Sequence, residues 1–91
     1  MINGKTDSGF DFTIADTVGD DMEFLELSVQ ADRGDFTVMP DLVLHLLGAE
    51  QKKALYEHCR TDGIVSTKKV AAEVRDIFGV IREAGESAEK N

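Results

Sequence analysis

Apolar residues recur at the start of the chain with a period of two. Residues 10–14 alternate strictly between apolar and polar, so Phe10, Phe12 and Ile14 would share one face of a half-buried strand. Turn-forming residues come before this run, and a short apolar stretch begins the chain. The pattern predicts a β-hairpin over residues 1–14, which must pack against helices because two short strands are marginally stable alone.

Beyond the hairpin, the apolar residues follow the 3.6-residue period of an α-helix. This period predicts helices over 17–33, 39–47, 49–60 and 67–83. The last residues, 85–91, offer no apolar anchor and predict a flexible tail. The expected fold is therefore mainly α, a compact bundle of about four helices with a short N-terminal β-hairpin, in one domain over 1–84.

Single residues indicate where these helices begin and end. Asp16 or Thr17 is expected to cap the first helix, and Ser66 is expected to cap the last. Gly48 separates the second and third helices and should end the former in a left-handed conformation. The Asp-Gly pair at 62–63 is expected to end the third helix.

The predicted helix over 17–33 has apolar residues on two nearly opposite faces. Val18, Met22, Leu25 and Val29 form the first face, and Phe24, Leu27 and Ala31 form the second. The second face could pack inward against the hairpin, which we favour, or remain exposed, since exposed apolar patches on small proteins usually mark contacts. As candidate protein-binding residues we take Phe24 and Leu27 with the adjoining acids Asp20 and Glu23.

Charge narrows the range of expected partners. The net charge is −8, and residues 1–35 hold nine acids against two bases, so they account for most of it. Such a field repels phosphate backbones and argues against nucleic-acid binding, although an ordinary solvated acidic face would look the same.

No stretch reaches the ~20 apolar residues needed to cross a bilayer, and the first residues do not resemble a signal peptide. We expect a cytoplasmic protein that binds neither nucleic acid nor membrane.

Residues able to perform chemistry are few and scattered. His45 and His58 fall on different predicted helices, and Cys59 is the only cysteine. Successive residues of a helix point about 100° apart, so Glu57, His58 and Cys59 cannot converge on one ion. Ser66 is better explained as a helix cap than as a nucleophile. We therefore predict no catalytic, cofactor or metal site and no enzymatic activity.

The order of these segments resembles a known family. A hairpin with NGK…GFDFTI is followed by the acidic helix DDMEFLELSVQADRGD, then by MPDLVLHLLGAEQKKALYEHCRTDGIVS and VAAEVRDIFGVI. This order resembles the small tail assembly chaperones of long-tailed bacteriophages and prophages, especially those of Gram-positive hosts. The resemblance covers about residues 1–82, and its most specific part is the block LLGAEQKKALYEH.

The resemblance implies a non-catalytic function in the cytoplasm of the bacterial host. Members of this family bind the tape measure protein, recruit tail tube protein and are absent from the finished particle. Some also have a longer form made by translational frameshifting, for which this chain would be the short form. Whether the protein is a homo-oligomer is left open.

Two other functions fit the same sequence. The protein could be a structural tail or connector subunit that stays in the virion. It could also be a small acidic regulator that binds a host protein by imitating DNA, which requires a regular double row of exposed carboxylates. The acids here cluster instead on one predicted helix.

Overall fold

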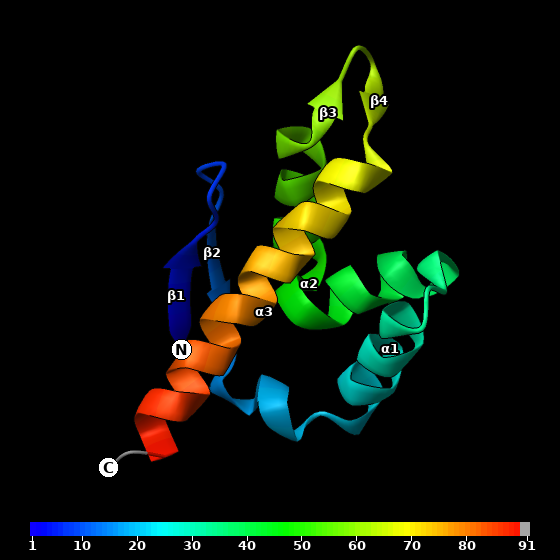
Figure 1. The fold of residues 1–91 in the computed structure, drawn as a ribbon. Helices are drawn as coiled ribbons and strands as arrows, with labels where there is room; N and C mark the ends of the chain where they lie inside the picture. Colours follow the sequence, from blue (N-terminus) through cyan, green and yellow to red (C-terminus); the bar gives the residue numbers. More distant parts are fainter. Residues whose placement is uncertain (90–91) are drawn as a thin grey trace.

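The computed structural model describes residues 1–89, with side chains described through residue 84. In chain order its elements are β1 (Ile2–Lys5), β2 (Asp11–Ile14), the short 3-10 helix η1 (Asp16–Asp20), α1 (Met22–Asp32), the 3-10 turn η2 (Phe36–Val38), α2 (Met39–His58), β3 (Arg60–Thr61), β4 (Ile64–Val65) and α3 (Thr67–Glu89). Figure 1 shows α3 running diagonally across the molecule, with β1 and β2 on one side and α1 on the other. The mainly α fold with an N-terminal hairpin is confirmed, but the described chain has three α-helices rather than four.

The N-terminal hairpin presents its apolar face to the helices, as predicted. β1 pairs with β2 in antiparallel fashion, and Phe10, Phe12 and Ile14 are all buried. Gly4 lies opposite Phe12, and a Cβ atom added to it would lie 2.6 Å from Cζ of that ring and 3.1 Å from Cγ1 of Val80 in α3. The absence of a side chain at Gly4 therefore lets β1 lie close to both the buried ring and α3.

The outer edge of β2 is joined to α2 through one side chain. The Gln51 amide accepts a hydrogen bond from the Thr13 backbone N–H and donates one to the Thr13 carbonyl, both at 2.7 Å. These bonds occupy backbone groups of Thr13 that face away from β1, and they fix the hairpin to the side of α2.

The two central helices that the sequence predicts, 39–47 and 49–60, are the two parts of α2, which is kinked at Gly48. Gly48 lies between them with φ 81° and ψ 167°, whereas the rest of α2 is helical. This combination of angles is essentially restricted to glycine and differs from the left-handed conformation expected there. Figure 1 shows the two parts running in different directions. We call them the first arm, 39–47, and the second arm, 49–58.

The predicted helix over 17–33 is wrong at its beginning. The segment before α1 forms only a short 3-10 helix, because glycine and aspartate have low helix propensity. Asp21 follows in an extended conformation, and its carboxylate accepts a hydrogen bond from the Phe24 backbone N–H at 3.1 Å. The cap of α1 is thus Asp21 rather than Asp16 or Thr17, and this hydrogen bond is the main reason that the pKa of Asp21 is lowered.

A second hairpin, β3–β4, was not predicted. The Asp-Gly pair at 62–63, expected only to end a helix, forms the turn of this hairpin, with φ values of 54° and 85°. Two central residues with positive φ form the turn that best matches the twist of a tight hairpin, and Asp-Gly is a strong sequence signal for it. The second arm of α2 therefore ends at His58 and not at residue 60.

The last helix begins as predicted and extends further. Ser66 precedes α3, and its Oγ accepts a hydrogen bond from the Lys69 backbone N–H at 3.3 Å, which confirms it as the cap. The helix continues to Glu89, beyond the expected end at residue 83. The last two residues of the predicted flexible tail, 90–91, lie outside the described residues.

The core lies where the two arms of α2, the inner face of α3 and the hairpin meet. Its most completely buried side chains are Ile14, Leu42, Val43, Leu55, Cys59 and Ile77. Both arms of α2 contribute to this set, so the direction of each arm decides whether the core can close. Within the described residues, no helix combines the length and apolarity required to span a bilayer.

The conformation of Gly48 gives a stability prediction. Replacing it in Gly48→Ala should lower the free energy of unfolding by about 1–3 kcal/mol, because alanine is strained at this φ and ψ. Gly79→Ala is the matched control, since Gly79 lies inside α3 and a Cβ added there meets nothing within 4 Å. That control should raise the stability by about 1 kcal/mol. Urea denaturation followed by circular dichroism measures the free energy of unfolding of both variants. A Gly48→Ala protein as stable as the parent would contradict the backbone conformation described for Gly48.

Candidate protein-binding groove

The second apolar face of α1 packs inward, which is the orientation we favoured. Phe24, Leu27 and Ala31 are half-buried against the core. The ring of Phe24 meets that of Phe78 in α3 edge-on, with the ring centroids 5.6 Å apart and the planes at 85°. Apart from this contact, α1 packs mainly against α2. Phe24 and Leu27 therefore contribute to the packing of the monomer.

The acids chosen as candidate binding residues lie on the surface. Asp20 ends η1 and Glu23 is in the first turn of α1, and both are exposed. The four candidates thus separate into two outward carboxylates and two inward apolar side chains. They do not form one continuous surface patch.

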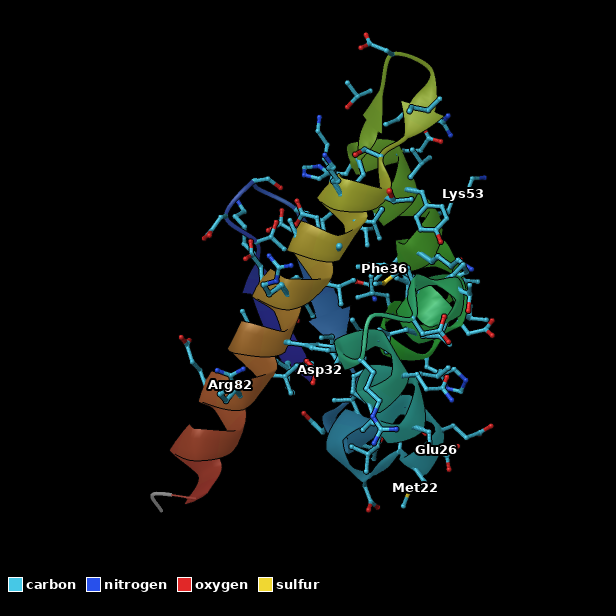
Figure 2. The ribbon with its side chains drawn as sticks, turned by 45° about the vertical axis from the view of Figure 1, so that its right-hand side comes forward. Met22, Glu26, Asp32, Phe36, Lys53 and Arg82 are labelled. Atoms are coloured by element: carbon cyan, nitrogen blue, oxygen red, sulfur yellow. The ribbon has the colours of Figure 1, made fainter. Side chains whose placement is uncertain are left out.

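The first apolar face of α1 is the one that remains exposed. Val18, in η1, is buried, but Met22, Leu25 and Val29 are 64%, 54% and 41% exposed. Figure 2 shows Met22 at the lower end of α1. The sequence showed that α1 has two apolar faces, but it could not show which face the rest of the chain would cover.

A groove lies between α3 and the segment from α1 to the start of α2. Phe36, in η2, is 63% exposed and lines three adjoining hollows. Two of them measure about 240 and 280 Å³. We define the Phe36 groove by its apolar lining: Phe36, Met39, Tyr56, Val65, Val70, Ala71, Val74 and Phe78.

Charged side chains border this apolar groove on both sides. Asp32 lies at its α1 border, and Lys68 and Arg75 lie at its α3 border. Figure 2 shows Asp32 and Phe36 on the side of α1 and η2 that is turned toward α3. An apolar floor between charged borders is the arrangement by which proteins bind the apolar face of an amphipathic helix.

One polar cluster joins three separate elements of the fold. Ser8, in the hairpin loop, has its Oγ 2.8 Å from Nε2 of His58 at the end of α2, and it also donates a hydrogen bond to Oε1 of Glu73 in α3. Glu73 is only 5% exposed, and its Oε2 is buried with no hydrogen-bond partner among the described residues. Neither Ser8 nor Glu73 stood out in the sequence, because the fold brings them together from positions 65 residues apart.

The geometry of this cluster differs from that of a hydrolytic triad. In a triad, serine and carboxylate contact opposite nitrogens of the histidine, so that the ring can accept the hydroxyl proton. Here the Ser8 hydroxyl and Oε1 of Glu73 both approach Nε2 of His58, the latter at 3.6 Å. The hydroxyl proton is directed to the carboxylate, and the cluster serves to attach the hairpin loop to α2 and α3.

The other reactive side chains are held apart. Cys59 is 1% exposed, and burial together with the nearby charge of Glu73 raises the pKa of its thiol, which disfavours the nucleophilic thiolate. His45 lies in the first arm of α2, with Nδ1 3.5 Å from Oδ2 of Asp21. Across the part of the chain that the structure describes, no three His, Cys, Asp or Glu side chains are placed to hold a metal ion.

Comparisons with known proteins found no matching family model, curated protein or solved structure.

The Ser8 cluster gives a second stability prediction. Ser8→Ala should lower the free energy of unfolding by about 1–3 kcal/mol, because it removes the hydroxyl that donates to the buried Glu73 carboxylate. The double variant Ser8→Ala/Glu73→Leu should recover most of this loss, since no unpartnered carboxylate then stays buried. Chemical denaturation of the three proteins measures the effect. An equal loss in the single and double variants would contradict this explanation.

Proposed function

We propose that this protein is a non-catalytic tail assembly chaperone of a long-tailed bacteriophage or prophage. In this proposal it binds the tape measure protein and recruits tail tube protein during tail morphogenesis, in the cytoplasm of the bacterial host. The observation that carries the proposal is the amount of large apolar surface that a small acidic chain leaves exposed, led by Phe36 and Met22 at 63% and 64%. The resemblance of the sequence to this class of chaperones supplies the identity of the partners.

The Phe36 groove is the part of the surface best suited to a helical partner. The resemblance implies a tape measure protein, whose long helices need their apolar stripes covered before the tail is assembled. An apolar stripe could enter the groove and be covered by Phe36, Met39 and Val70, while polar flanks of the partner meet Asp32 and Arg75. The net charge of −8 would keep the resulting complex from aggregating.

The alternatives have less support from the surface. A structural tail or connector subunit could use the same groove for a permanent contact, and mass spectrometry of purified particles separates the two functions because a chaperone should be absent. A DNA-imitating regulator needs uninterrupted rows of carboxylates. On α1 the acids Glu23 and Glu26 are interrupted by the exposed apolar residues Met22 and Leu25.

Co-expression with a fragment of the cognate tape measure protein tests the proposal. We expect the fragment to become soluble and to elute with the chaperone in size-exclusion chromatography. Phe36→Ser should reduce the recovered complex by about tenfold, because large apolar residues at the centre of an interface carry most of the binding energy. Ile64→Ser is the matched control, since Ile64 is 67% exposed in β4 and does not line the groove.

A fragment that stays insoluble with the parent protein would contradict the chaperone function. Equal recovery with Phe36→Ser and with Ile64→Ser would instead show that the groove is not the site of contact.

A further inference from the structure

The outward face of α1 is a second apolar surface, which adjoins the Phe36 groove at Asp32. Met22, Leu25 and Val29 have the spacing i, i+3 and i+7, which places them in one stripe along the helix. All three are more than 40% exposed. The face of α1 that carries Phe24 and Leu27 is occupied by the core, so this stripe is the apolar surface that α1 offers to another molecule.

Negative charge borders this stripe on both sides. At about 100° per residue, Glu26 and Glu23 lie along one side and Asp32 lies along the other. Figure 2 shows Glu26 on the outer side of α1 and Asp32 toward α3. Residues 22–32 contain no lysine or arginine, and Arg33, which caps the end of α1, is the one base beside the stripe. Among the side chains that the structure describes, the three carboxylates form no ion pair.

We propose that the outward face of α1 binds a cationic amphipathic helix of another protein. The partner would bury one apolar stripe against Met22, Leu25 and Val29 and would place lysine or arginine against Glu26 and Asp32. An anionic membrane surface fits poorly, because such surfaces attract basic segments and α1 carries only acids. This inference does not depend on the proposed chaperone function, since it concerns other apolar side chains and names its partner by charge.

Fluorescence anisotropy with labelled synthetic peptides tests the inference. The probe is a leucine–lysine peptide with leucine repeated at helical spacing. Two further peptides serve as comparisons: the same composition in scrambled order, and a leucine–glutamate peptide with the same leucine positions. We expect the amphipathic leucine–lysine peptide to bind at least about tenfold more tightly than either comparison peptide. Its affinity should fall as salt is added.

Variants then locate the binding site. Leu25→Gln and Glu26→Lys should each weaken binding of the leucine–lysine peptide by about tenfold. Met22→Gln should also weaken binding. Because the Met22 side chain is 64% exposed and contributes little to folding, weaker binding by this variant would not reflect a damaged structure. Ile64→Gln is the control, since Ile64 is 67% exposed in β4, and it should bind the peptide as the parent does.

Three results would overturn the inference. Equal binding of the scrambled peptide would show that charge alone attracts it, and unchanged binding by both Leu25→Gln and Met22→Gln would place the site elsewhere. Co-sedimentation of the protein with phosphatidylserine vesicles would indicate a lipid surface instead. The peptide assay contains no tape measure fragment, so a failure here can be distinguished from a failure of the chaperone proposal.

Discussion

The backbone conformation of Gly48 determines the direction of both arms of α2, and most other elements pack against one of these arms. The first arm supports α1 and contributes Leu42 and Val43 to the core, while the second arm brings Leu55 and Cys59 to the same core from another direction. A straight helix of the same length would place these side chains along one line, and they could not enclose a core with α3 and the hairpin. One glycine conformation therefore allows a chain of 91 residues to build a core from so few elements.

The small number of helices and strands also explains the exposed apolar surface. α1 is a single helix with apolar residues on two faces, and α2 and α3 can cover only the face that carries Phe24 and Leu27. The outward stripe of Met22 and Leu25 stays in contact with water because no further element is available among the described residues to cover it. Exposing such side chains has an energetic cost in the isolated molecule, and a partner that covered them would recover it.

Much of the fold follows from local sequence signals, and the candidate site does so only in part. The alternation at Phe10, Phe12 and Ile14 and the cap at Ser66 are local, and both were predicted correctly. The start of α1 was misplaced because Asp16 and Thr17 were taken as caps, although the glycine and aspartates that follow them disfavour a helix before Asp21. The Asp-Gly pair is a clear signal for the turn of the β3–β4 hairpin, but it was taken only as the end of a helix. Which face of α1 is covered, and the meeting of Ser8 with Glu73, depend on contacts between distant segments that no local pattern encodes.

The attachment of Gln51 to Thr13 has a consequence for behaviour at high concentration. A two-stranded hairpin has two open sides, and a strand with free N–H and carbonyl groups is a template on which another chain can add a strand. The Gln51 amide satisfies the outward N–H and carbonyl of Thr13 in the way that a neighbouring strand would. A glutamine on a helix thus takes the place of a third strand, which protects β2 from intermolecular β-sheet growth.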